Sequence, residues 1–270
     1  MSKVPIENVW ARDLAWRLFR DAADEDYLVA RWSMKANLPY QFAWSAQQCL
    51  EKYLKCSLVL NGKDTRSYGH ELNQMWSIMA DIAGDLLPCV LCPPWYFPKS
   101  FDSYGGRFEV TSDFISRVER SGDPNQRYRY YHIVNEVGDI HKFDQVVFSI
   151  RRVTYPLDMV YCDTSKSYRE MLSSNRLLQP HPKFSFDRSG WKRGEEERMR
   201  ILKWQNFSFF EDDAIDVGQI QKGLSSINSP ISMNLNKTEE RSQALNWFMQ
   251  HAKFSKKDRV ALLEAIGAKS

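Results

Sequence analysis

The sequence predicts a mostly helical protein, and three observations lead to this fold class. Apolar residues recur every three or four positions through several long stretches, which is the spacing of one face of an α-helix. Hydrophobic residues make up 43% of the chain and aromatic residues 13%, enough to fill a packed core. The charged fraction of 26% is ordinary, so the composition does not indicate extensive disorder. We expect a four-helix up-and-down bundle in residues 1–162 and a smaller helical extension in residues 163–270.

Three stretches supply the first helices of this bundle. Residues 40–60 and 69–86 predict a helical hairpin, because each has one apolar face and Asn61-Gly62 offers a residue that readily takes a positive φ. Residues 6–37 predict the helix before it. The apolar stripe of that helix consists of Val9, Trp10, Leu14, Leu18, Ala22, Tyr27, Leu28 and Trp32.

An aromatic segment separates the hairpin from the last helix. Residues 88–111 contain four prolines, a Gly-Gly pair and six aromatic residues, which favours an ordered loop over a helix. A short helix is predicted over residues 112–120, and residues 126–137 fit either an extended or a helical conformation. The last helix of the bundle spans residues 142–160. We therefore interpret residues 88–138 as an aromatic loop inserted before that helix.

The C-terminal extension is predicted to be helical as well. Residues 190–204 have the composition of a charged helix, and residues 238–252 and 255–266 have clear helical periodicity. We expect the extension to pack on the bundle or on a partner.

Several classes of chemistry are excluded by their missing motifs. The chain contains no phosphate-binding Gly-x-x-x-x-Gly-Lys loop, no dinucleotide-binding Gly-x-Gly-x-x-Gly, no Gly-x-Ser-x-Gly and no His-Glu-x-x-His. The net charge of +3 does not by itself indicate nucleic-acid binding. We expect no cofactor.

The cysteines indicate neither a disulfide framework nor a metal site. Cys49 and Cys56 lie on the apolar side of a predicted helix and are interpreted as core residues. Cys89 and Cys92 have the spacing of a metal or redox pair, but no second pair and no neighbouring His accompanies them, so we expect a hydrophobic loop without metal. The odd count of five cysteines fits a reducing cytoplasm. The N-terminus has no signal-peptide pattern, and no apolar run reaches the length of a membrane-spanning helix.

Two motifs of the predicted hairpin resemble the HEPN superfamily. The helix carries Ala46-Gln47-Gln48, Glu51-Lys52 and Leu54-Lys55, and the next helix opens with His70-Glu71-Leu72. The family pattern is similar: Gln-Ala-x-Glu-Lys-x-Leu-Lys, followed by His-Asp-Leu. Residues 26–31 resemble the first helix of the family, and Leu38-Pro39-Tyr40 its corner. The resemblance covers roughly residues 20–160. It implies a HEPN-like four-helix bundle that forms a homodimer.

The resemblance also points to one pair of candidate catalytic residues. Ribonucleases of this family carry an Arg and a His separated by four to six residues, and Arg127 and His132 are separated by four. A His can transfer the proton of a ribose 2′-OH, and an Arg can neutralise the phosphate as charge builds on it. The chain departs from the family at Tyr128, where a small or polar residue is usual, and in the distance from His132 to the last helix. The alternative is a basic, aromatic segment that packs on the bundle.

Neighbouring residues extend this candidate site toward RNA or nucleotide binding. The aromatic and basic side chains could stack on bases and contact phosphates; they are Tyr128, Arg129, Tyr130, Arg151 and Arg152. The alternative for Arg151 and Arg152 is a solvated helix face. Arg66 and His70 are a rival pair whose spacing is one residue short. For His70 the resemblance implies a structural role, in which the imidazole hydrogen-bonds locally at the start of a helix.

Two classes of function therefore remain open. The first is a non-catalytic HEPN module that binds a nucleotide, RNA or a protein partner such as a nucleotidyltransferase antitoxin. The second is a metal-independent endoribonuclease, a toxin or antiviral effector, that uses Arg127 and His132. The sequence favours the first, because the Arg-His pair is imperfect.

Overall fold

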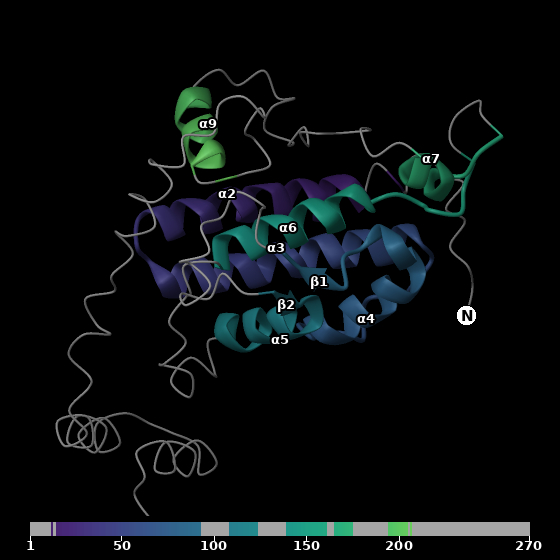
Figure 1. The fold of residues 1–270 in the computed structure, drawn as a ribbon, viewed down its shortest axis with the longest axis horizontal. Coiled ribbons are helices and arrows are strands. Elements are labelled where there is room, and N and C mark those ends of the chain that lie inside the picture. Colours follow the sequence, from purple (N-terminus) through teal and green to yellow (C-terminus); the bar gives the residue numbers. More distant parts are fainter. Residues whose placement is uncertain are drawn as a thin grey trace, which may run out of the picture.

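The structure, a computed structural model, is mostly helical, as the sequence predicts. The long helices lie side by side as a bundle (Figure 1). The residues that it describes are Arg12, 15–92, 108–123, 139–160, 165–174, 194–204 and Asn206.

The first two long helices form an antiparallel pair joined by a tight corner. A π-helical turn, η1 (Trp16–Arg20), continues directly into α2 (Asp21–Lys35). Asn37 takes a left-handed φ of 56° at the corner, and Leu38 donates its backbone N–H to the carbonyl of Ser33 over 2.8 Å. Pro39 then opens α3 (Pro39–Leu60), in the first turn where its missing N–H has no intrahelical acceptor anyway. α3 is the centre of the bundle and contacts α2, α4, α5 and α6.

The end of α3 is fixed by Asn61 and Gly62. Gly62 has a φ of 72°, as the predicted turn requires. The Asn61 side chain donates to the carbonyls of Ser57 (2.7 Å) and Tyr155 (3.0 Å) and accepts the backbone N–H of Leu157 (3.0 Å). It thus ties the end of α3 to the chain that follows the last helix of the bundle. The predicted helical hairpin is confirmed: its second helix is α4 (Leu72–Ala83), extended by the 3-10 turn η2 (Gly84–Leu86).

The segment predicted as an inserted loop contributes a strand pair and, among the described residues, one further helix of the bundle. β1 (Val90–Leu91) pairs antiparallel with β2 (Glu109–Val110), with Val90 opposite Val110. α5 (Thr111–Gly122) follows at once and packs on α3 and α4. Its Phe114, Ile115 and Val118 are buried in the common core.

Two contacts show how closely α5 fits. The Glu119 carboxylate of α5 accepts the backbone N–H of Asn73 over 2.8 Å and so caps the N-terminus of α4. At Gly122 an added Cβ would lie 2.4 Å from Cβ of Gln47 on α3, so only glycine fits there. The prediction of a short helix over residues 112–120 is therefore right, and this part of the predicted insertion belongs to the core of the bundle. Periodicity locates a helix but does not say what covers its apolar face.

The last helix of the bundle is shorter than predicted. α6 (Asp139–Arg152) begins three residues before the predicted start at 142 and ends well before 160. Pro156 explains the end, because it has no N–H to donate to the carbonyl of Arg152 four residues earlier, and its ring disfavours helical dihedrals at the residue before it.

Two helices of the C-terminal extension pack on the bundle. They are α7 (Tyr168–Ser174) and α9 (Glu195–Lys203), the second of which lies within the predicted helix 190–204. Leu172 and Leu202 are part of the same hydrophobic cluster as the bundle helices. The predicted boundary at residue 162 lies outside the described residues, as do the predicted helices over 238–252 and 255–266.

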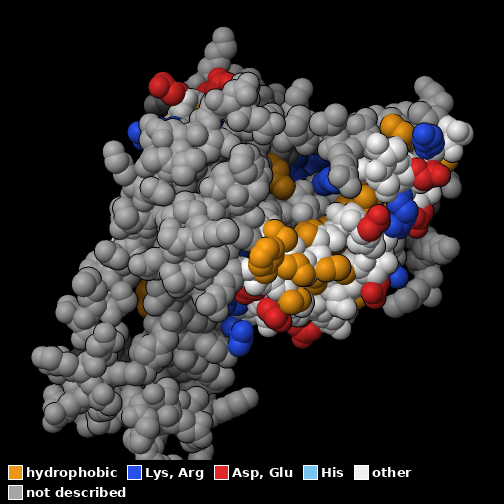
Figure 2. All heavy atoms as spheres, in the orientation of Figure 1, with side chains coloured by type: hydrophobic (Ala, Val, Ile, Leu, Met, Phe, Trp, Pro, Cys, Tyr) orange, Lys and Arg blue, Asp and Glu red, His pale blue; other side chains and the backbone are white. Residues whose placement is uncertain are grey.

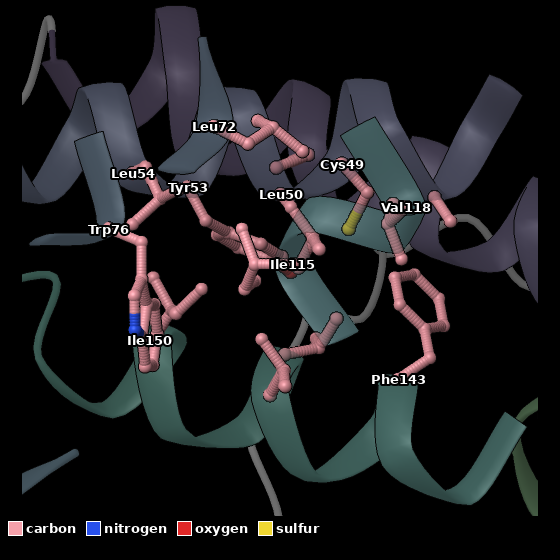
Figure 3. Close-up of a cluster of buried hydrophobic side chains, with 14 of the residues drawn as sticks. Cys49, Leu50, Tyr53, Leu54, Leu72, Trp76, Ile115, Val118, Phe143 and Ile150 are labelled. Atoms are coloured by element: carbon pink, nitrogen blue, oxygen red, sulfur yellow. The ribbon is translucent and has the colours of Figure 1, made fainter. Parts of the chain in front are cut away.

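A single large hydrophobic cluster joins α2, α3, α4, α5 and α6 (Figure 3). The predicted apolar faces of residues 42–58, 72–82 and 143–157 meet in it, with Leu54 and Leu50 of α3 fully buried. Tyr27, Phe42 and Phe143 form tilted and edge-on ring contacts at one end of the cluster, with centroids 5.5–5.6 Å apart.

The apolar stripe predicted for the first helix is partly wrong. Leu18 is 59% exposed and Trp32 47%, although both are in the predicted stripe. The inward face of α2 instead includes Asp24 and Arg31, both fully buried. A hydrophobic pattern cannot anticipate charged side chains on the inward face, so it assigns that face incorrectly.

The surface carries an apolar patch over the strand pair. Figure 2 shows hydrophobic side chains gathered over β1 and β2, where Val90, Phe108 and Val110 are exposed. Among the described helices, none combines the length and the apolar character that a membrane span requires.

We expect Leu54→Asp to abolish cooperative folding. An unpaired buried carboxylate costs several kcal/mol, comparable with the whole stability of about 5–15 kcal/mol that a domain has. Val29→Asp is the matched control, because Val29 is exposed on α2 and the same chemical change there should leave folding intact. Circular dichroism during thermal unfolding makes the comparison. A Leu54→Asp protein that melts cooperatively at the wild-type temperature would contradict the core assignment.

Candidate functional site

Most of the residues predicted from the sequence to form a site lie outside the described part of the chain. They are Arg127, Tyr128, Arg129, Tyr130 and His132. The structure describes both neighbouring ends, Asp123 after α5 and Asp139 at the start of α6.

The start of α6 is held by a network of four charged side chains. Arg117 of α5 forms a bidentate pair with Asp139 (2.6 and 2.7 Å) and also donates to Glu109 of β2 (2.9 Å). Lys142 contacts the same Glu109 carboxylate at 2.8 Å. Burial by itself would raise the pKa of Glu109. The hydrogen bonds from Arg117 and Lys142 outweigh burial, so the pKa of Glu109 is lowered. The segment with the Arg-His pair therefore enters α6 at a residue that is tightly fixed.

Arg151 is not placed to bind RNA. Its side chain is only about 5% exposed, and its guanidinium pairs with both carboxylate oxygens of Asp24 on α2 (2.9 and 3.1 Å). The Tyr53 hydroxyl donates to the same carboxylate over 2.6 Å. This position contradicts both sequence interpretations of Arg151, as a phosphate contact and as a solvated residue. The side chain instead joins α6 to α2.

Arg152, the other basic residue of this pair, is half-buried. Its guanidinium donates to the carbonyl of Leu172 and so connects α6 to α7. Neither arginine of α6 therefore extends a basic patch on the surface.

A second buried network surrounds Asp144 of α6. Its carboxylate accepts the Tyr27 hydroxyl over 2.7 Å and pairs with Arg31, and both of these residues are on α2. Arg31 also donates to the carbonyls of Ile201 (3.2 Å) and Trp204, so it caps the C-terminal end of α9. Burial, and then the negative charge of Asp144, raise the pKa of Tyr27 well above its usual value, which keeps the phenol neutral.

His141 lies beside this network and is buried in the first turn of α6. Burial, and then the positive charge of Arg31, lower the pKa of His141 to about 3. The imidazole is therefore neutral in the folded protein at physiological pH. The sequence places His141 at a helix start but gives no sign of its burial.

The Glu-Lys and His-Glu-Leu motifs meet at the α3–α4 corner. His70 Nδ1 lies 2.7 Å from Glu51 Oε2, and the other Glu51 oxygen lies 2.6 Å from Lys55 Nζ. The Glu51 carboxylate is buried, whereas the His70 side chain is 72% exposed. The hydrogen bond expected for His70 is therefore present, but its acceptor is on the preceding helix and not at the start of its own.

Arg66, the rival partner of His70, is on the same loop. Its guanidinium is exposed and pairs with Asp64 at 2.6–3.2 Å. Hydrogen bonds from the Arg66 side chain and backbone lower the pKa of Asp64 to about 2. The sequence identifies both residues but not their partners. His70 contacts a buried residue of α3, whereas Arg66, among the described residues, pairs only with Asp64 of its own loop.

Cys89 and Cys92 flank a strand, which does not suit a shared metal. Both thiols are exposed and free. An extended strand advances roughly 3.3 Å per residue and alternates its side chains, so residues three apart lie on opposite faces. The Cys92 backbone is further fixed by Gln145 of α6, which accepts its N–H (3.1 Å) and donates to its carbonyl (2.6 Å). Within the described residues, no group of three or more His, Cys, Asp or Glu side chains could hold a metal ion.

Comparison with protein-family models, with curated proteins and with solved structures finds no match to this chain. Its function must therefore be argued from its own residues.

We predict that purified protein contains no stoichiometric zinc. Binding by Cys89 and Cys92 together would require the β1–β2 pairing to open, because one metal needs its ligands on one side of the chain. Elemental analysis, with Cys89→Ser as the matched control, makes the test. One equivalent of zinc that is lost in the variant would contradict the prediction.

We predict that His141 makes folding sensitive to mild acid. Its folded pKa of about 3 lies below the unfolded value of 6.5, so between these two values only the unfolded state binds the proton. The free energy of unfolding should fall by about 1.4 kcal/mol for each pH unit below ~6.5 through this group alone. Above that pH its contribution should be constant.

Urea unfolding at pH 7, 6 and 5 measures this effect as the difference between wild type and His141→Gln. As the pH falls, the free energy of unfolding should decrease less steeply in the variant than in wild type. The difference between the two slopes should correspond to close to one proton taken up on unfolding. Equal slopes in the two proteins would show that His141 is accessible to protons in the folded state.

Proposed function

We propose that this chain is a HEPN-type module that binds RNA or a nucleotide. One observation carries the proposal. The two motifs that resemble the family fold into neighbouring elements of one helical bundle, and their polar residues Glu51 and His70 are in contact at 2.7 Å. The contact joins a residue of the first motif to a residue of the second across the α3–α4 loop.

The RNA-binding surface that we propose is the stretch from Arg127 to His132. Its arginines would neutralise phosphates, and its tyrosines would offer flat faces for stacking on unpaired bases. Arg151 and Arg152 are left out of this surface, because Arg151 pairs with Asp24 inside the bundle and Arg152 donates to the carbonyl of Leu172 on α7. By the same resemblance we propose a homodimer, and a nucleotidyltransferase antitoxin as a protein partner.

A metal-independent endoribonuclease is the second candidate, favoured by the spacing of Arg127 and His132. The ribose 2′-OH is then the nucleophile, so no metal is needed. The Arg would stabilise the charge on the phosphate, and the His would transfer a proton.

The test of binding is the affinity of full-length protein for single-stranded RNA as salt is raised. Each lost phosphate contact reduces the slope of log affinity against log salt by roughly 0.7 for a single strand. Arg127→Ala and Arg129→Ala should therefore weaken binding and flatten the slope. Lys203→Ala, which removes an exposed positive charge on α9, is the matched control and should leave both unchanged. Wild-type protein that binds no RNA would contradict the proposal.

The test of cleavage is the same RNA incubated with protein in EDTA. A ribonuclease of this kind leaves a 2′,3′-cyclic phosphate. His132→Ala should then cost on the order of a hundredfold or more in rate. If the chain only binds, no cleavage appears at any protein concentration, and His132→Ala leaves the affinity nearly intact.

A further inference from the structure

The imidazole of His70 is held in one orientation although it is on the surface. Its Nδ1 lies 2.7 Å from Glu51 Oε2, while most of the ring remains exposed. Glu51 is on α3, the central helix of the bundle, and its carboxylate is buried. A rigid helix therefore presents a buried acceptor to an exposed ring.

The carboxylate itself cannot turn freely, because both of its oxygens are engaged. Oε1 accepts a hydrogen bond from Lys55 Nζ over 2.6 Å, one helical turn further along α3. Oε2 is the atom that meets His70. Two charged side chains of α3 thus stand next to this ring: Glu51 contacts His70, and Lys55 contacts Glu51.

The loop that carries His70 is also shaped to hold it. Gly69 has a φ of +53°, a conformation that other residues rarely adopt. Tyr68 packs against the hydrophobic core, and its carbonyl accepts the backbone N–H of Glu71 over 2.9 Å. The backbone on both sides of His70 is therefore fixed by a tight turn.

This arrangement selects one tautomer of the imidazole. A neutral ring that donates Nδ1–H to Glu51 leaves the lone pair of Nε2 available, and Nε2 is on the other side of the ring. A carboxylate that orients an imidazole in this way is the arrangement by which a His serves as a general base. Arg66 on the same loop offers a guanidinium whose exposed pair with Asp64 is easily exchanged for a phosphate.

We propose that His70, positioned by Glu51, transfers a proton in the cleavage of RNA at the α3–α4 corner. Nε2 takes the proton of a ribose 2′-OH, and the 2′ oxygen forms a bond to the neighbouring phosphorus. The bond from phosphorus to the 5′ oxygen breaks, and water gives that oxygen a proton. The products are a 2′,3′-cyclic phosphate and a 5′-OH end. The choice of RNA as substrate rests on the proposed function; the choice of residue rests on the geometry of this corner.

The experiment measures cleavage of single-stranded RNA by the full chain in EDTA. His70→Ala should lower kcat on the order of a hundredfold or more and leave KM and the melting temperature unchanged. Added imidazole should restore part of the activity of His70→Ala, because an exposed site admits the free base and a purely structural role would not respond to it. Glu51→Gln keeps the shape of the side chain but not its charge, and it should lower kcat without rescue by imidazole. Lys203→Ala, which removes an exposed positive charge on α9, is the control with wild-type activity.

Three outcomes would overturn the inference. They are a wild-type protein that binds RNA without cutting it, a His70→Ala protein with full activity, and a cleavage activity that only His132→Ala removes. The first of these leaves the proposed binding function standing, whereas a protein that binds no RNA contradicts that function itself. His70→Asn, which keeps a polar side chain of similar size, replaces His70→Ala if the alanine variant does not fold.

Discussion

The inward face of α2 carries two buried charges, and the arrangement of the remaining helices depends on how these charges are paired. Two ion pairs join α2 to α6. In the first, α2 supplies the acid (Asp24) and α6 the base (Arg151); in the second, α2 supplies the base (Arg31) and α6 the acid (Asp144). Such pairs add little net stability over well-packed apolar residues, but removing one partner costs about 3–5 kcal/mol. Their main effect is therefore on geometry. Only one rotation of α2 and one register of α6 satisfy both pairs together with the hydroxyls of Tyr27 and Tyr53.

This constraint extends beyond the bundle to the C-terminal residues. Arg31 is oriented by Asp144, and in that orientation it reaches the last carbonyls of α9. Asn206 donates to the Tyr27 hydroxyl over 2.9 Å from just beyond that helix. The position of α9 thus follows from a charge pair between two other helices. The same pairing withdraws Arg151 from the surface, so this residue is not available as a phosphate contact.

The functional proposals depend on two imidazoles at different places in the chain. His132 is proposed from its spacing to Arg127 and from the resemblance to a family. His70 is proposed from a fixed contact with a buried carboxylate on the central helix. The chemistry is similar, since each would act as a proton acceptor, but the supporting observations are independent. His141, a third histidine, is excluded from such a role because it is buried away from solvent, and its pKa of about 3 makes it a very weak base.

The sequence by itself determined the helical class, the α3–α4 hairpin with its Asn61-Gly62 turn, and the short helix that became α5. These features depend on local periodicity and turn chemistry, which a single stretch of chain contains. It did not determine which side of α2 faces inward, that α5 belongs to the core, or that Arg151 is buried. Each of these depends on residues far apart in sequence, such as Asp24 with Arg151 and Gly122 with Gln47. A buried charge in particular cannot be distinguished from a surface charge until its partner is in place, and only the tertiary structure brings the two together.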